Sequence, residues 1–180
     1  MAIEFSIASD IERLTRNLSD LQRRRLPRAI NSTLNKVATT VRKESVKEIS
    51  RASGLKAKDV RARVDLIRSN FTRLEAIVKA SGKHSNIARF NARQTRRGVS
   101  AAPWRKRRVF PGAFLGNQGR TAFIRTGKGR LPVKSLAGPS IPREFARDTA
   151  KKVLLDVGAR RFREILPREL RFVLSQKGGR

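Results

Sequence analysis

The chain has 180 residues, a length typical of one domain, and its 43 Lys and Arg residues against 14 Asp and Glu residues give a formal net charge of +29. So cationic a surface repels itself until a polyanion neutralises it, and we therefore expect a nucleic acid or an acidic protein as partner. Because 38% of the residues are hydrophobic, the chain can still form a core. Cysteine is absent and His84 is the single histidine, which excludes disulfides, thiolate catalysis, Cys-ligated zinc, a His-based metal cluster and a Ser-His-Asp triad.

The N-terminal residues predict a first amphipathic helix. Ser9 and Glu12 have the spacing of a capping box, and the apolar residues that follow recur on one helical face. Pro27 is expected to interrupt this helix, because proline lacks the backbone donor that a helix interior needs. The first residues contain neither a basic leader nor a long apolar run, so we expect the protein to begin in the cytosol and not to enter a membrane.

A second amphipathic helix is predicted over about residues 28–50. Its apolar stripe consists of Ile30, Leu34, Val37, Ala38 and Val41. Lys36, Lys43 and Lys47 fall on the opposite face at 3.6 residues per turn. These lysines form either an ordinary solvated face or a stripe that faces a polyanion.

Ser53 and Gly54 are expected to end this helix, and residues 55–64 have another short helical pattern that ends near Leu66. Two helices around a glycine turn are compatible with a helix-turn-helix. Many helical hairpins share this pattern, however, and no base-reading side chains are identified. A plain helical hairpin is the preferred interpretation.

The middle of the chain predicts a small antiparallel sheet. Residues 73–80 are rich in strand-forming residues, and residues 121–126 and 131–136 predict a hairpin around residues 127–129. Residues 82–120 are expected to form an irregular basic arm, long enough to reach a neighbouring subunit and to become ordered upon assembly.

The C-terminal part is predicted to be helical. Ser140 is a candidate N-cap, and Pro142 suits the first turn of a helix. Pro167 is expected to break this helix before a last turn or two. The fold class is therefore α+β in a single domain of residues 1–180, with a helical part (1–66), a basic sheet and extended arm (67–139) and C-terminal helices (140–176).

The positive charge is concentrated in the middle of the chain. No acidic residue lies between Glu75 and Glu144, a stretch of 68 residues that contains 16 Lys or Arg residues. A surface of this kind neutralises phosphates without reading sequence. The residues predicted to contact nucleic acid or an acidic partner are Arg89, Arg93, Arg96, Arg97, Arg105, Lys106, Arg107, Arg108, Lys128, Arg130, Lys36, Lys43 and Lys47.

Trp104 stands directly before the basic run of residues 105–108. Its indole either anchors this loop on the core, which is the preferred interpretation, or stacks on a base. Further along, the PGAF block and the residue before it supply candidates for subunit contact or for the fold, namely Phe110, Pro111 and Phe114.

Residues with catalytic potential are scarce. Asp59 and Asp65 lie among arginines, so local ion pairs are favoured over acid–base chemistry. The glycines of residues 112–129 lack a GxxxxGK[ST] motif and are assigned to turns, and His84 is assigned to a polar surface loop. We predict no catalytic, cofactor-binding or metal-binding residues and no enzymatic activity.

Several blocks together carry a resemblance to a known family. They are Ala29–Asn31 in an amphipathic helix, residues 110–114 (FPGAF), residues 131–133 (LPV) running into residues 137–142 (AGPSIP), and residues 166–170 (LPREL). In this order the chain resembles the minor tail protein Z family of long-tailed phages, over most of its length. The resemblance implies a tail-completion role at the head-proximal end of the tail, where such proteins are needed to join a finished tail to a filled head and to place the genome end in the connector.

The resemblance and the charge together imply a structural subunit of the tail or neck. Its expected partners are further copies of itself in a ring, the tail terminator or tail-tube proteins, the head–tail connector, and the end of the double-stranded genome DNA. Six copies are the natural expectation and three are an alternative. The expected location is the virion, after assembly in the host cytoplasm.

Three other functions compete with this interpretation. A DNA-binding regulator would need a recognition helix, and a ribosomal or other RNA-binding protein would fit the charge nearly as well. A nuclease would need a carboxylate cluster for metal ions, against which the acid-free middle of the chain argues.

Overall fold

The computed structural model describes residues 2–3 and 20–175, with the side chains of residues 25–175. The capping box at Ser9 and Glu12 lies outside the described residues. Two compact units form, and each is built from separate stretches of the chain. Unit 1 contains residues 45–64 and 80–150, and unit 2 contains the described residues up to 44 together with residues 65–79 and 151–175. Helices and short antiparallel strands confirm the α+β class.

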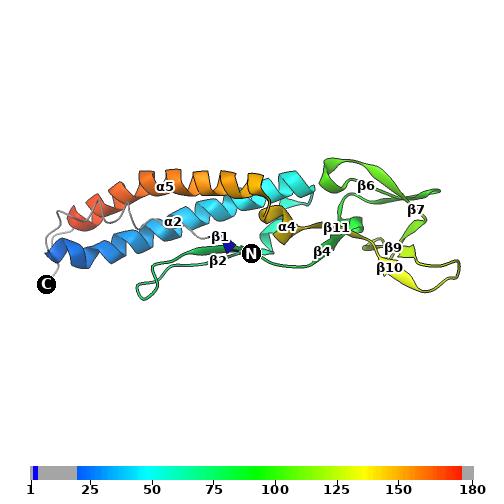
Figure 1. Cartoon of the computed structure of the whole chain (residues 1–180), viewed down its shortest axis with the longest axis horizontal. Coiled ribbons are helices and arrows are strands. Elements are labelled where there is room, and N and C mark those ends of the chain that lie inside the picture. The colour runs from blue at the N-terminus through cyan, green and yellow to red at the C-terminus, as the bar shows by residue number, and fades with distance from the viewer. Residues whose placement is uncertain (1, 4–19, 176–180) are drawn as a thin grey trace. The chain divides into compact units, whose positions relative to one another are not determined.

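Two long helices supply most of unit 2. They are α2 (Asp20–Ser53), which belongs to unit 2 up to residue 44, and α5 (Asp148–Ser175), which belongs to it from residue 151. In this unit they run side by side (Figure 1), and the Arg25 Nη1 donates to the Val173 carbonyl oxygen at 3.5 Å. The buried side chains recur at helical spacing, as predicted for the first of these helices: Ala29, Ile30, Thr33, Val37, Ala38 and Val41 on α2, and Leu154, Phe162, Leu166 and Val173 on α5.

Pro27 and Pro167 do not end these helices, and both predictions were wrong. Each proline lies inside a continuous helix. A proline in a helix interior costs about 3 kcal/mol. Buried neighbours offset this cost, since Ala29 and Ile30 follow Pro27 and Leu166 precedes Pro167.

Short strands complete unit 2. The sheet has the order β1 (Ala2–Ile3), β3 (Ile77–Ala80), β2 (Val64–Ile67), and Ala2 pairs with Lys79 in an antiparallel register. The helical pattern predicted to end near Leu66 therefore stops earlier, at α3 (Ala57–Arg61), and the strand predicted over residues 73–80 is limited to its second half.

Unit 1 consists mainly of short strands in small sheets. The sheet orders are β5-β6-β7, β10-β9-β8 and β11-β4. The elements are β4 (His84–Asn86), η1 (Ile87–Arg89), β5 (Arg93–Thr95), β6 (Gly98–Ala101), η2 (Pro103–Arg105), β7 (Arg108–Pro111), β8 (Ala113–Gly116), β9 (Thr121–Arg125), β10 (Val133–Ser135), β11 (Ala137–Ser140) and α4 (Ile141–Phe145). The predicted hairpin is confirmed, with Val133 opposite Arg125, whereas residues 82–120 form strands and not the irregular arm that was expected.

The strands of unit 1 lack a regular apolar pattern, and two amide side chains help to hold them together. Asn86 accepts from the Ala122 backbone N–H at 2.7 Å and donates to the Ala122 carbonyl at 3.1 Å, so its amide joins β4 to β9. Gln94 accepts from the Leu115 N–H at 2.9 Å and thereby connects β5 to β8. Such contacts form between residues distant in sequence, which is why composition alone suggested an irregular segment.

The ends of the helices in unit 1 follow the sequence signals in part. Gly54 has φ +80° directly after α2, as the predicted glycine stop requires. Pro142 lies in the first turn of α4, but the Ser140 side chain makes no capping hydrogen bond. With only the residues Ala57–Arg61, α3 is too short for a recognition helix, so the helix-turn-helix interpretation is not supported.

Candidate nucleic-acid interface

A basic loop joins β6 to β7 and is held in an uncommon conformation. We call residues 103–108 the basic loop. Trp104 and Arg105 both have left-handed backbone conformations, with φ values of 52° and 60°. Residues other than glycine rarely adopt such angles unless the surrounding structure holds them there, and such positions cluster at functional sites.

Trp104 fixes the loop to α4 through a buried carboxylate. Its indole Nε1 donates to the Glu144 Oε1 at 2.9 Å, and Glu144 is only 2% exposed. The Arg147 Nε lies 3.1 Å from the other carboxylate oxygen, Oε2, which forms no well-aligned hydrogen bond within residues 25–175. Arg108 lies over the Trp104 ring, 5.5 Å from its centroid. Trp104 is therefore placed as an anchor of the loop, the preferred of the two interpretations.

Two arginines of the loop also bind backbone atoms. The Arg105 Nε donates to the Arg51 carbonyl at 3.0 Å, where the C-terminal end of α2 favours a positive charge. Arg107 donates from Nη1 to the Ser100 hydroxyl at 3.2 Å and from Nη2 to the Asn91 carbonyl at 3.3 Å. Both residues remain exposed, so they shape the loop and still present charge to solvent.

The remaining basic residues of unit 1 differ in how they are engaged. Arg89 forms an ion pair with Asp59 at 3.6 Å, so the predicted ion pairing of Asp59 is found, although with a more distant arginine. Of the residues predicted to contact nucleic acid or an acidic partner, those that are exposed in unit 1 and pair with no described carboxylate include Arg93, Arg96, Arg97, Lys106, Lys128 and Arg130. Together with the basic loop they leave unit 1 with a strongly positive surface.

The lysines predicted on α2 are all exposed. Lys43 belongs to unit 2 and Lys47 to unit 1. In unit 2, the Lys36 Nζ lies 2.5 Å from the Glu169 Oε1. This hydrogen bond lowers the pKa of the Glu169 carboxyl, aided by a hydrogen bond from Ser32 and by the charge of Lys36, while partial burial opposes the shift. Lys36 thus has a structural contact that the charge pattern did not predict.

The aromatic residues of the PGAF region take part in the fold of unit 1. The rings of Phe114 and Phe123 lie 5.9 Å apart between centroids, and Arg125 lies 4.9 Å from the centroid of the Phe114 ring. Arg108 lies 5.0 Å from the centroid of the Phe110 ring, and Pro111 is exposed at the end of β7. A role of these residues in subunit contact stays a prediction.

Sequence reasoning missed a pocket beside the basic loop. It measures about 530 Å³ and lies within unit 1, between the loop, β11 and α4. Its lining residues include His84, Trp104, Arg143, Glu144 and Arg147. His84 is exposed, as predicted, but it opens strand β4, where its Nδ1 lies 3.1 Å from the Gly138 carbonyl, and does not lie in a loop. One wall of the pocket is formed by part of the AGPSIP segment, residues 137–142. Its two prolines were the sequence feature from which this pocket could have been suspected.

Residues 25–175 contain no group of three or more His, Cys, Asp or Glu side chains that could hold a metal ion. Among the described helices, none is both long and apolar enough to cross a bilayer. The fold and the site thus define a small, strongly basic α+β protein. Its most positive surface is formed by the short strands between Glu75 and Glu144, which contain no acidic residue.

Comparison with known families gives the affiliation of the chain. Residues 10–176 match the family described as prophage minor tail protein Z (GPZ), so the chain belongs to this family of phage minor tail proteins. No curated protein and no solved structure matches it significantly. Membership of a structural tail family implies a location in the virion, with other virion proteins as neighbours, and suggests that the protein is not an enzyme.

Proposed function

We propose that this protein is a tail-completion subunit that forms a ring at the head-proximal end of the tail and supports head–tail joining. The ring, with six copies as the simplest count, holds the genome end by electrostatic contacts that do not depend on base sequence. Its neighbours are the tail terminator or tail-tube proteins on one side and the head–tail connector on the other. Family membership and the charge of the chain support this role.

One observation carries the proposal of DNA contact. The acid-free stretch of the sequence folds into short strands whose arginines are exposed, and the basic loop among them is fixed by the bond from Trp104 to Glu144. A preorganised positive surface binds phosphates with little ordering cost. Within unit 1, α3 and α4 have only five residues each and are too short for a recognition helix, so recognition of the DNA backbone is favoured over recognition of base sequence.

A charge-neutralised variant tests this contact. Arg93, Arg96, Arg97 and Lys106 are exposed and have no described intramolecular contact through their side chains, so changing all four to Gln should spare the fold. DNA affinity should fall, and the dependence of log affinity on log salt should become shallower by about 0.9 for each phosphate that the variant no longer neutralises. Random and selected duplexes should lose affinity equally.

A matched variant separates local contact from total charge. Changing Lys152, Arg160, Arg163 and Arg168 of α5 to Gln removes the same charge from exposed positions of unit 2. This second variant should retain most of the DNA affinity and support tail completion in a complementation assay. If both variants lost DNA affinity equally, the effect would come from total net charge and not from a local contact. If the first variant still joined heads to tails normally, the proposed DNA contact would be contradicted.

A further inference from the structure

The pocket beside the basic loop contains a buried acceptor that the fold leaves unsatisfied. Glu144 lines this pocket and is 2% exposed. Its Oε1 accepts from the Trp104 indole, whereas its Oε2 accepts no well-aligned hydrogen bond within residues 25–175. Buried polar atoms in folded proteins nearly always have a partner. The open oxygen is therefore suited to accept from an N–H or O–H group of a bound ligand.

Two arginines give the same pocket a positive lining. Arg143 and Arg147 both line it and are exposed. The Arg147 Nε lies 3.1 Å from the Glu144 Oε2, while its side chain remains 52% exposed. The Arg143 guanidinium has no described side-chain contact. Two guanidinium groups beside one carboxylate favour an anionic ligand and repel a lysine or arginine of a partner.

An aromatic ring forms part of the remaining, apolar lining. Trp104 lines the pocket together with Ala137 and Pro139. The hydrogen bond to Glu144 uses the edge of the indole, and Trp104 remains 36% exposed. Exposed aromatic rings near arginines are the usual stacking partners of unpaired bases. The positive φ of Trp104, 52°, fits such a role, because strained backbone is concentrated at binding sites.

Size and chemistry together favour a nucleotide as the ligand. The pocket measures about 530 Å³, and sites for small ligands typically measure about 300–1,000 Å³. Its lining suits a ligand that combines a negative group for the arginines, a flat apolar part for Trp104 and a donor for Glu144. A nucleotide has all three, since cytosine, adenine and guanine each carry an exocyclic amino group. A phosphate ion alone would leave the carboxylate oxygen unsatisfied.

We propose that this pocket holds one unpaired nucleotide of DNA, with its phosphate on Arg143, its base against Trp104 and its exocyclic amino group donating to the Glu144 Oε2. The nucleotide is unpaired, because a base stacked within a duplex cannot enter a pocket. Thymine has no exocyclic amino group and presents carbonyl oxygens that a carboxylate repels, so the pocket discriminates against it. The inference rests on the proposed DNA contact and adds a site for a single base to it.

Tryptophan fluorescence tests the inference, because Trp104 is the single tryptophan of the chain and lines the pocket. The probes are dCMP and dUMP, which carry the same phosphate and differ in the amino or carbonyl group of the base. After correction for nucleotide absorption, dCMP should bind about 10-fold more tightly than dUMP, as expected for one hydrogen bond to a charged group. Deoxyribose 5-phosphate, which lacks the base, should bind more weakly than dCMP.

Two variants assign the contacts. Arg143→Gln should weaken the binding of dCMP and dUMP equally, by about 10-fold, because it removes a phosphate ligand and no described contact of the fold. Glu144→Gln keeps an acceptor for the Trp104 indole but replaces the second oxygen by a donor, so it should remove the preference for dCMP. Arg120→Gln removes the same charge from an exposed position of unit 1 outside the pocket lining, and both affinities should stay unchanged.

Several results would contradict the inference. One is equal binding of dCMP, dUMP and deoxyribose 5-phosphate to the wild-type chain, and another is unchanged binding by Arg143→Gln. Acetyl-alanyl-alanine carries a carboxylate and N–H donors, so tighter binding of this peptide than of dCMP would assign the pocket to a protein terminus instead. Circular dichroism verifies that each variant is folded. If Glu144→Gln does not fold, the ratio of dCMP to dUMP affinity in the wild-type chain still decides the role of the carboxylate.

Two duplexes distinguish a DNA end from a free nucleotide. One duplex has a single unpaired cytidine at an end, and the other is blunt with an equal number of phosphates. The wild-type chain should bind the first more tightly, and Arg143→Gln should lose most of this difference. Equal binding of both duplexes would overturn the inference and leave the electrostatic DNA contact in place. Failure of both duplexes to bind would instead contradict the DNA contact itself, so the two proposals fail separately.

Discussion

The indole N–H of Trp104 and the buried carboxylate of Glu144 form a 2.9 Å hydrogen bond that joins the basic loop to α4. The bond brings together residues that are 40 positions apart in the sequence. It holds a tryptophan with positive φ at the start of a run of four basic residues. The positive surface of unit 1 therefore depends on one of the few acidic side chains near it.

Replacing Trp104 by Phe should destabilise the protein and disorder the basic loop. The change keeps an aromatic ring but removes the donor, which leaves a buried carboxylate oxygen unpaired at a cost of about 1–3 kcal/mol. Urea unfolding measures this loss. Lys106→Gln, in the same loop but without a described side-chain contact, should change the free energy of unfolding by less than about 0.5 kcal/mol.

Replacing Gly98 by Ala should be among the most damaging single changes in unit 1. Gly98 has φ +140°, and a Cβ there would lie 2.1 Å from the Phe110 carbonyl oxygen, so the pairing of β6 with β7 must shift. We expect a loss of at least about 3 kcal/mol in thermal or urea unfolding, from backbone strain and overpacking together. Gly112 has φ +68° with open space around its Cβ position, so Gly112→Ala should cost only about 1–2 kcal/mol. Similar losses for both variants would contradict the steric explanation.

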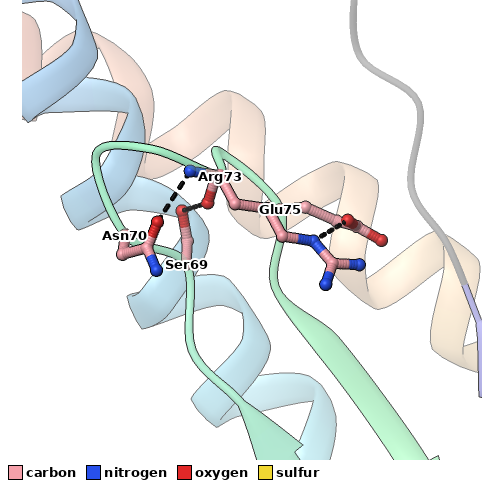
Figure 2. Close-up of polar contacts among 4 residues, drawn as sticks. All are labelled: Ser69, Asn70, Arg73 and Glu75. Carbon is pink, nitrogen blue, oxygen red and sulfur yellow. Dashed lines mark hydrogen bonds and ion pairs between the residues drawn. The ribbon is translucent and has the colours of Figure 1, made fainter.

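Replacing Asn35 by Ala should release from α2 the loop between β2 and β3, which Asn70 and Arg73 close through a hydrogen bond (Figure 2). Both backbone groups of Ser69 lose their partner, for an expected loss of about 1–3 kcal/mol. Hydrogen exchange should accelerate at the Ser69 amide in particular. Thr39→Ala removes only an exposed hydroxyl that bonds to the Asn35 carbonyl of its own helix, and protection of Ser69 should then persist.

The contribution of Glu169 to stability should depend on pH. Its carboxyl has a pKa lowered mainly by the hydrogen bond from Lys36, so the folded state favours the ionised form. This contribution is complete above the unfolded pKa of Glu, about 4.3, and is lost as pH falls through the lower pKa of the folded state. Glu169→Gln should therefore cost about 0.5–1 kcal/mol near pH 7, because the Lys36 side chain is half exposed, and the difference from wild type should vanish in acid. A difference that persists in acid would point to packing instead.

The sequence predicted the helical parts of the fold better than the strands. The apolar stripe from Ile30 to Val41 identified α2, and Gly54 marked its end. The predicted helix breaks at Pro27 and Pro167 were wrong, because tertiary packing around these prolines outweighs their low helix propensity. The strands of residues 82–120 are short, and Asn86 and Gln94 join them by long-range hydrogen bonds that no periodicity reveals.

The charged surface was predictable from composition, but its construction was not. The absence of acids between Glu75 and Glu144 located the basic stretch correctly. Which of its arginines are structural follows from contacts with partners far along the chain, such as the Arg51 carbonyl bound by Arg105. The ordered loop between β2 and β3 also went unrecognised, because its anchor, Asn35, precedes it by more than 30 residues.

The interleaved composition of the two units has a consequence for synthesis of the protein. Unit 2 requires residues before 45 and residues after 150, while most of unit 1 lies between them. As the chain leaves the ribosome, the strands of unit 1 can pair before α5 exists, whereas α2 must wait for its partner helix until residues 151–175 have been made. The exposed apolar face of α2 is then the part of the nascent chain that most needs protection from aggregation.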